Sequence, residues 1–257
     1  MHKLIGKAFI SGRIVVKTGL HIGGSKTVLD IGGVDLNVIK THLGVPYIPG
    51  SSLKGKLRSI LAREEGSLAI KREPGMPSDM TVDSENINTI FGKGADKEAE
   101  GAQAQKTPEK CLLTRLIVRD ALLDTTHFRK HFYDIEPDDK DFEDDLVSYT
   151  EIKTENTINR MTGTAQHPRQ LERVPANAEF DFEIIYNIFD EEEKVSHLNA
   201  LMQAMRILED DYLGGSGSRG YGQIGFKGMK YEYKSTDEYK NGNKRKALDL
   251  KGITSLD

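Results

Sequence analysis

The stretch EEEKVSHLNALMQAMRILEDDYLGGSGSRGYGQIGF, residues 191–226, contains three different patterns in succession. Its first part predicts a helix over 191–210, because apolar residues recur at helical spacing and share one face: Val195, Leu198, Leu201, Met202, Met205 and Leu208. Residues 223–226 have the composition of a strand. Between them, residues 214–222 contain five glycines, one arginine and one aromatic residue, and no carboxylate. We therefore expect a helix and a strand joined by a glycine-rich loop.

Two roles are open for this loop, residues 214–222. Glycine has no Cβ, so successive backbone amides can approach phosphate oxygens closely. Arg219, with Gly217 and Gly220 on either side, would add a charge-assisted hydrogen bond to such an anion. A flexible connection between a helix and a strand would use the same residues without binding anything. The rest of the chain favours a polyanion site.

The elements that precede the loop complete a recognisable order. Strands are expected at 4–18, 110–124 and 178–188, and a helix at 51–65 with Leu53, Leu57, Ile60 and Leu61 on one face. With the helix at 191–210 and a strand near 221–233, the order is β-α-β-β-α-β. This order predicts an α+β fold with a ferredoxin-like or RRM-like core. We expect a single domain over 1–257, whose core comprises 4–18, 51–65, 110–124 and 177–233.

Three segments fall outside this core and are expected to be insertions: 19–49, 66–107 and 125–176. The second is polar and has a short helical pattern near residues 87–91. Insertions on a compact core commonly carry binding residues. The polar, basic segment 234–257 is expected to be a frayed tail.

The charge of the chain is uneven. The net charge is −4, but residues 134–145 hold eight of the 40 acids and one of the 36 bases, so the remainder carries 32 acids and 35 bases, a net charge of +3. Such a run is typical of a solvated loop. A nucleic-acid site would therefore have to be a local basic patch.

The composition also limits the location of the protein and its covalent chemistry. No apolar run approaches the roughly 18 residues of a membrane span, and a signal-peptide pattern is absent from the N-terminus. Cys111 is the single cysteine, which excludes an internal disulfide and a cysteine-rich zinc site. We expect a cytoplasmic protein with no membrane contact and no structural zinc.

The sequence GSSLKGK at 50–56 matches the start of a phosphate-binding loop, but Leu57 stands where a Ser or Thr would have to bind magnesium. A nucleotide-hydrolysing function is therefore disfavoured. Open amides at a helix N-terminus still form an anion site. The residues expected to contribute to it are Ser51, Ser52, Lys54 and Arg58. The alternative is an ordinary helix capped by Ser51 or Ser52, with solvated cations.

Three further groups are candidates for binding or chemistry. His21 lies beside two glycines and could contact a sugar or a phosphate, although an isolated histidine is commonly structural. Asp30 and Asp35 lie on a glycine-rich stretch, where an aspartate either assists phosphodiester chemistry or caps a turn. In residues 149–164, Lys153 and Arg160 could reach phosphates while Ile152, Ile158 and Met161 wedge between bases; a plain exposed hairpin is the alternative.

Several of these motifs, taken in order, resemble the RAMP superfamily. More narrowly, they resemble the repeated backbone subunit of type III-A CRISPR effector (Csm) complexes. The resemblance extends from the first strand to about Tyr233. The segments that carry it are TGLHIGGS at 18–25, IGGVDLNVI at 31–39, YIPGSSLKGKLR at 47–58, IFG at 90–92, RVPA at 173–176 and LGGSGSRGYG at 213–222.

The resemblance implies an RRM-like palm with inserted fingers and a thumb hairpin, which would be Tyr149–Arg173. Copies would stack as a filament along a guide RNA, together with other Csm-type subunits, and the thumb would dislodge one base at each step. The implied guide-backbone contacts are His21, Ser51, Ser52, Lys54, Arg58 and the loop around Arg219.

The family also cleaves complementary target RNA once per subunit, in a reaction that depends on a divalent metal ion, with Mg²⁺ the first candidate. By its position in the IGGVD stretch, the matching aspartate is Asp35 rather than Asp30. Attack would come from the 2′-hydroxyl of the substrate itself, so the protein mainly orients the strand and stabilises developing charge.

Two features depart from the family pattern. Some relatives carry a zinc cluster in the insertions, whereas here Cys111 is alone and His127, His131 and His167 are scattered. The acidic run at 134–145 also has no counterpart in the resemblance. Two other functions stay open: a purely structural RNA-binding subunit without cleavage, and a guide-processing endonuclease that uses His21 without metal.

Overall fold

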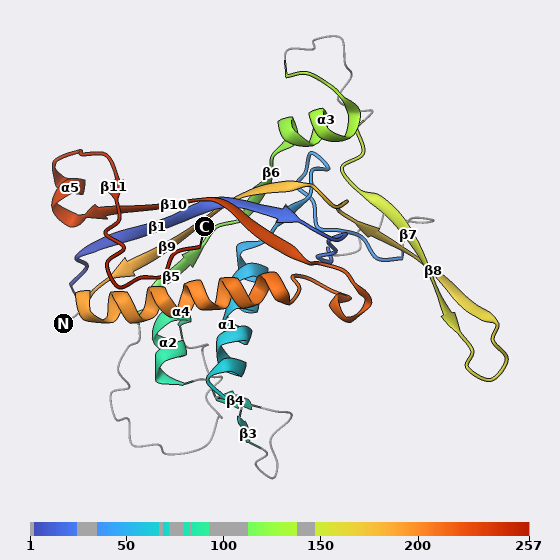
Figure 1. Ribbon diagram of the computed structural model, residues 1–257, viewed down its shortest axis with the longest axis horizontal. Coiled ribbons are helices and arrows are strands. Elements are labelled where there is room, and N and C mark those ends of the chain that lie inside the picture. Colours follow the sequence, from blue (N-terminus) through green and yellow to red (C-terminus); the bar gives the residue numbers. More distant parts are fainter. Residues whose placement is uncertain are drawn as a thin grey trace.

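The computed structural model of the protein describes residues 3–24, 35–66, 69–71, 80–82, 84–92, 113–137 and 147–256. They form a mixed α/β fold in which helices α1 and α4 lie along the same face of an antiparallel sheet (Figure 1). The elements are β1 (Gly6–Val16), β2 (Tyr47–Ile48), α1 (Gly50–Glu64), β3 (Ala69–Lys71), β4 (Met80–Val82), α2 (Glu85–Phe91), β5 (Leu116–Val118), β6 (Ala121–Leu123), α3 (Thr125–Tyr133), β7 (Glu151–Ile158), β8 (Ala165–Arg173), β9 (Glu179–Ile188), α4 (Glu191–Asp210), the short 3-10 helix η2 (Gly217–Arg219), β10 (Ile224–Ser235), α5 (Thr236–Lys240) and β11 (Lys246–Ala247).

The central sheet is built around β1. Its strand order is β11-β10-β1-β9-β6-β2, and β5 also pairs with β9. All of these pairings are antiparallel. Ile10 of β1 lies opposite Ile184 of β9 and Tyr231 of β10, and a β-bulge follows between Ser11 and Arg13. Two smaller antiparallel pairs, β3-β4 and β7-β8, lie outside this sheet.

Alternation along the strands places one set of side chains under the helices. The even-numbered residues of β1 and β9 other than Gly12, among them Ile10, Ile14, Phe180 and Ile184, are buried. They belong to the same core as the apolar faces of α1 and α4, which include Leu53, Leu57, Leu61, Leu201, Met202 and Met205. Burial of each such side chain contributes on the order of 1.5–3 kcal/mol.

Most of the expected elements are present. The helix expected at 191–210 is α4, the helix expected at 51–65 is α1, and the short helical pattern near 87–91 is α2. The expected strand at 110–124 is instead two short strands, β5 and β6. The pairing with β9 passes from Val118–Ile184 to Leu122–Asp181, so the chain between β5 and β6 contains one extra residue. There the Arg119 amide donates to the Glu183 carbonyl, and the Asp120 carboxylate accepts a hydrogen bond from the Gly50 amide.

The segments expected to be insertions contribute more to the fold than the sequence suggested. Segment 19–49 supplies β2 to one edge of the sheet, and α3 follows β6 directly. The hairpin β7-β8 projects away from the sheet, as Figure 1 shows. None of the helices in the described ranges has both the length and the apolar character needed to cross a bilayer.

The expectation of a frayed C-terminal tail is wrong. Residues 236–240 form α5, β11 pairs with β10, and the apolar side chains of Leu248, Ile253 and Leu256 are buried. The Arg206 guanidinium of α4 donates to the carbonyls of Thr254 and Ser255, both at 2.7 Å. Three apolar residues spaced through a polar segment are therefore enough to attach it to the core, although they form no regular pattern.

A buried polar group lies where β9 meets the beginning of α4. The Tyr186 hydroxyl and His197 Nδ1 share a hydrogen bond of 2.7 Å, and Arg115 is buried nearby and paired with Glu193. Burial, together with the neighbouring positive charge of Arg115, lowers the pKa of His197 below its usual value. His197 is therefore neutral in the folded protein.

We predict that this histidine makes stability depend on pH. Because the pKa of His197 is lowered by folding, the unfolded chain binds the proton more readily, and the free energy of unfolding should decrease as pH falls below about 6.5. His197→Gln should reduce that decrease, at a cost of about 1 kcal/mol at neutral pH for the altered hydrogen bond.

Urea unfolding at pH 7.5 and pH 5.5 would measure this effect, with the exposed His42→Gln as the control. The carboxylates Glu172 and Glu179, whose pKa values are lowered in the fold, contribute at lower pH and do not confound this window. Equal pH dependence in wild type and His197→Gln would contradict the assignment.

Candidate nucleic-acid interface

The glycine-rich loop packs directly on the backbone that leaves β1. The Gly215 amide donates to the His21 carbonyl at 2.8 Å, and the Gly222 amide donates to the Gly19 carbonyl at 3.1 Å. A Cβ added at Gly214, where φ is +79°, would lie 2.3 Å from the His21 carbonyl oxygen. Only glycine permits so close an approach with this backbone conformation.

The same loop is joined to α1. A Cβ at Gly217 would lie 1.9 Å from the Tyr212 ring, so this glycine is stacked on the aromatic face. Lys56 of α1 contacts two residues that lie just before the loop. Its ammonium group is 3.7 Å from the centre of the Tyr212 ring and 2.9 Å from Asp211 Oδ2. Lys56 therefore attaches α1 to the beginning of the loop.

The base of the β7-β8 hairpin meets the other end of the loop. The buried Tyr221 hydroxyl donates to Glu155 Oε1 at 2.7 Å. Lys153 and Arg173 lie over the Tyr221 ring, 4.4 Å and 5.3 Å from its centre, and Arg219 lies 3.9 Å from Glu155. Two cations thus lie over the Tyr221 ring, and a third, Arg219, is paired with the carboxylate that the Tyr221 hydroxyl bonds to.

A second contact network links His21, the hairpin and the Asp35 segment. His21 is 7% exposed, and its Nδ1 donates to the Glu172 carbonyl at 2.7 Å. The Glu172 carboxylate accepts from the Val38 amide at 2.9 Å, from the Thr150 hydroxyl at 2.6 Å and from Lys40. Burial alone would raise the pKa of Glu172, but these donors outweigh it and lower the pKa. Glu172 is therefore charged, and its hydrogen bonds hold the Asp35 segment against the hairpin.

Asp35 lies at the edge of this network. Its side chain is exposed, and Oδ2 accepts a hydrogen bond of 2.9 Å from the Gln170 amide of β8. The backbone that follows Asp35 is hydrogen-bonded to β8 on one side and to segment 19–24 on the other. The Glu172 amide donates to the Leu36 carbonyl at 3.0 Å, and the Ile39 amide donates to the Ile22 carbonyl at 2.9 Å. Asp30, the alternative candidate, lies outside the described residues.

The N-terminus of α1 differs from expectation. Neither Ser51 nor Ser52 caps the helix; the cap residue is Pro49, and the Gly50 amide donates to Asp120 Oδ1 at 2.8 Å. Ser51 is exposed and Ser52 is half-buried. A carboxylate of the chain thus already occupies part of the helix N-terminus.

Lys54 and Arg58 lie on a different side of α1 from Lys56. The Lys54 ammonium donates to the Leu116 carbonyl at 3.2 Å, and burial together with Arg58 lowers its pKa. Arg58 donates to the Gly92 carbonyl at 3.0 Å and to the Asn88 side chain at 3.2 Å. Both cations tie α1 to neighbouring elements, and the structure attaches α1 to the glycine-rich loop through Lys56.

The hairpin carries exposed apolar side chains. Met161 in the turn is 96% exposed; Ile158, next to the turn, and Ile152, near the base, are also exposed. Arg160 lies in the same turn, which Asn159 closes by accepting from the amides of Met161 and Thr162. Lys153 lies at the base of the hairpin and Arg160 at its tip, so these two candidates occupy separate places.

The sequence did not identify four residues as part of this region: Lys56, Glu155, Glu172 and Tyr221, whose ring lies beneath two cations. Lys56 lies in the motif at 50–58, but Lys54 and Arg58 were expected to be its basic binding residues. Glu155 and Glu172 belong to a hairpin whose charges alternate, and nothing local distinguishes them. Their partners, Tyr221 and Val38, are 66 and 134 residues away in the chain.

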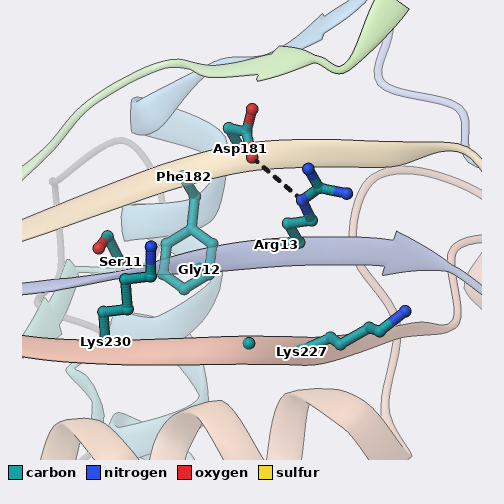
Figure 2. A pocket seen from close by; sticks show the side chains of 8 residues that line it. Ser11, Gly12, Arg13, Asp181, Phe182, Lys227 and Lys230 are labelled. Carbon is teal, nitrogen blue, oxygen red and sulfur yellow. Dashed lines mark ion pairs between the residues drawn. The ribbon is translucent and has the colours of Figure 1, made fainter. Parts of the chain in front are cut away.

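A separate pocket lies on the open face of the central sheet (Figure 2). It has a volume of about 500 Å³ and is lined by Ser11, Gly12, Arg13, Asp181, Phe182, Lys227, Gly228 and Lys230. Arg13 lies 3.5 Å from Asp181 and also pairs with Asp124 and Glu179. None of the candidate residues lines this pocket.

Within the described ranges, no group of three or more His, Cys, Asp or Glu side chains could hold a metal ion. His127 and His131 stack on each other on α3, and Cys111 lies outside these ranges. A magnesium ion commonly takes only one or two carboxylates from a protein, together with substrate phosphates and water. The exposed Asp35 fits that requirement as a single carboxylate ligand.

Comparisons with known proteins identify the family. The sequence model of the RAMP superfamily, a protein family, matches residues 13–225 of this chain. The chain is 40% identical over 257 residues to the CRISPR system Cms endoribonuclease Csm3 of Methanocaldococcus jannaschii, covering 98% of this chain and 91% of the relative. It is 41% identical over 229 residues to the protein of the same name from Streptococcus thermophilus, covering 87% and 89% of the two chains.

A solved structure agrees with these relatives. The chain matches a chain in the crystal structure of the Csm3-Csm4 subcomplex of the type III-A CRISPR-Cas interference complex, with a TM-score of 0.52 and 28% identity over 95% of this chain and 90% of that one. The protein belongs to the RAMP superfamily and, within it, to the Csm3 family.

Proposed function

We propose that the protein is a guide-RNA-binding filament subunit of a type III-A CRISPR effector complex and that it cleaves complementary target RNA at regular intervals. One observation carries this proposal: segments far apart in the sequence are bonded to one another around the glycine-rich loop. Segment 19–24 and the β7-β8 hairpin contact the loop directly, and segment 35–40 pairs with both of them. The relatives named as endoribonucleases support the cleavage activity.

The finer fold assignment supports the same function. We propose a single domain over 1–257 whose ferredoxin-like core is β1, α1, β5 with β6, β9, α4 and β10. These elements follow one another in the order β-α-β-β-α-β, and their strands occupy four neighbouring positions of one antiparallel sheet. The β7-β8 hairpin would be the thumb, and the segments around β3, β4 and α2 would be fingers.

The proposed RNA contacts are to phosphate and sugar. Arg219, whose side chain is 58% exposed, the loop backbone at Gly217 and Gly220, and Lys153 border one surface; the Gly220 amide itself donates to the Gly217 carbonyl. His21 is buried and bonded through Nδ1, so it would support this surface from inside the protein and would not extend toward the RNA. Ser51, Ser52, Lys54, Arg58 and Arg160 would extend the path along α1 and the hairpin. Backbone contacts carry no sequence information, so base pairing with the guide supplies specificity.

For cleavage we assign the catalytic role to Asp35. The 2′-hydroxyl of the target would attack the adjacent phosphorus, a cyclic phosphate would form, and the bond to the 5′-oxygen would break, releasing a 5′-hydroxyl. A divalent ion such as Mg²⁺, held by Asp35 and RNA phosphate, would neutralise charge on the phosphate. The remaining task of the chain is to hold the strand in line, with Gln170 and Glu172 fixing the Asp35 segment.

The proposed partners follow from the same relatives. A Csm3 chain assembles with a Csm4 chain in the solved subcomplex. We propose that this protein likewise assembles in the cytoplasm with copies of itself, with other Csm-type subunits, and with guide and target RNA.

We predict that Asp35→Asn abolishes cleavage but not binding. The amide keeps an acceptor for the Gln170 amide while the negative charge is lost, so the cleavage rate should fall by at least about 100-fold. The measurement is the cut pattern of a labelled complementary RNA incubated with the assembled complex, with and without chelator.

Asp249→Asn is the matched control, because Asp249 is also exposed and accepts one backbone hydrogen bond, from Lys251. Unchanged cutting by Asp35→Asn would contradict the catalytic assignment. Cutting that persists in chelator and stops on replacement of His21 would favour the guide-processing function. A wild-type complex that binds target without cutting it would favour a purely structural subunit.

We predict that Arg219→Ala weakens binding about equally for RNAs of unrelated sequence. The slope of log Kd against log salt should decrease by about 0.7, as expected for one lost phosphate contact on a single strand. Lys54→Ala should weaken binding in the same uniform way and should also lower the thermal midpoint, because its ammonium bonds to the Leu116 carbonyl. A loss confined to one RNA sequence would argue against backbone contacts.

We predict that Gly217→Ala displaces the glycine-rich loop. The added Cβ would have to move away from the Tyr212 ring, so RNA binding should fall by about tenfold or more while the core stays folded. Gly55→Ala is the control, because no atom lies within 4 Å of a Cβ added at this helical position. Fluorescence anisotropy with labelled RNA and circular dichroism would separate the two effects.

A further inference from the structure

We infer that Glu155 is a restraining carboxylate that lowers the affinity of the glycine-rich loop surface for RNA, and that Tyr221 holds it in a position where the restraint is only partial. This inference rests on the proposed RNA-binding function and concerns the strength of that binding. It assigns a role to a carboxylate that contacts Tyr221, Lys153 and Arg219 together.

The contacts of Glu155 are asymmetric. Its Oε1 accepts from the Tyr221 hydroxyl at 2.7 Å and lies 3.3 Å from the Lys153 ammonium. Its Oε2 lies 3.9 Å from Arg219 Nη1, at the outer limit of an ion pair. The carboxylate is therefore held close to Tyr221 and Lys153 and only loosely associated with Arg219.

Glu155 carries a full charge at neutral pH. The hydrogen bond from Tyr221 is the main cause of its lowered pKa, and Lys153 and Arg219 lower the pKa further. Burial and the same hydrogen bond raise the pKa of Tyr221 to about 12, so the hydroxyl keeps its proton and stays a donor. A phosphate that approaches Lys153 or Arg219 thus meets a permanent negative charge beside them and must compete with it.

The Tyr221 hydroxyl limits this competition. Tyr221 is 1% exposed and its ring lies beneath Lys153 and Arg173, so the hydroxyl is fixed in position. Without that donor, the carboxylate would be free to turn toward the exposed Arg219 and pair with it more closely. Loss of the hydroxyl should therefore strengthen the restraint, and loss of the carboxylate charge should remove it.

The first test compares Glu155→Gln with wild type. The glutamine keeps an oxygen that accepts from Tyr221 but carries no charge, so we expect RNA to bind about two- to fivefold more tightly, with a steeper salt dependence. The full-length chain would be titrated into a labelled single-stranded RNA of mixed sequence at several salt concentrations. Glu183→Gln is the matched control, since Glu183 pairs with two arginines, Arg119 and Arg245, on the open sheet face.

The second test uses Tyr221→Phe, alone and combined with Glu155→Gln. Tyr221→Phe keeps the ring beneath the cations, and we expect it to weaken RNA binding about two- to fivefold because Glu155 is released. The double variant should bind at least as tightly as wild type. A merely structural role for the hydroxyl would leave the double variant as weak as Tyr221→Phe, and thermal midpoints would show whether any variant is misfolded.

The outcomes separate the two proposals. If Glu155→Gln binds RNA no more tightly than wild type, or tightens it no more than Glu183→Gln does, the restraint is overturned while RNA binding stands. If Glu155→Gln does not rescue Tyr221→Phe, the role of the hydroxyl is overturned. If the wild-type chain shows no salt-dependent RNA binding, the proposed function fails and the inference fails with it.

Discussion

The close approach between the glycine-rich loop and the backbone of residues 19–22 is the constraint on which the rest of the site depends. The Gly215 amide bonds to the His21 carbonyl, and the position of Gly214 leaves no space for a Cβ. This contact brings the end of α4 against the segment that leaves β1, although some 190 residues separate the two in the sequence. With any other residue at 214, the two backbones would move apart and His21 would lose its support.

A buried charge extends this contact to the Asp35 segment. Glu172 receives hydrogen bonds from Val38, Thr150 and Lys40, and its own carbonyl receives one from His21. A buried carboxylate is costly unless its lone pairs are satisfied, so these donors stabilise each other's positions. The hairpin, the Asp35 segment and the glycine-rich loop are consequently held as one unit, while the Asp35 carboxylate itself stays exposed.

Local sequence patterns predicted the helices and strands that bury one face. The division of strands and the individual side-chain contacts depend on pairings between residues far apart in the sequence. Helical spacing predicted α4 and α1, and alternation predicted β9, because burial of one face leaves a periodic trace in the sequence. The division into β5 and β6 occurs where Asp120 bonds to Gly50, 70 residues away, and leaves no such trace. The same holds for Lys56, which meets Asp211 although Lys54 and Arg58 lie beside it in the same motif. Individual contacts of the site therefore became visible only once the chain was folded.

The distribution of paired charges explains how a chain with a net charge of −4 can be suited to RNA. Several basic residues near the proposed path already have partners: Lys56 bonds to Asp211, Arg58 to Asn88, and Lys153 to Glu155. Binding would then rest on backbone amides and on exposed cations with loose partners, such as Arg219 at 3.9 Å from Glu155, instead of on a broad basic surface. Such a site gains less from counterion release than a basic groove does, so its strength would come from repetition along stacked copies. A carboxylate placed among those cations, as Glu155 is, would on our inference weaken each single contact, and the number of copies would then matter more.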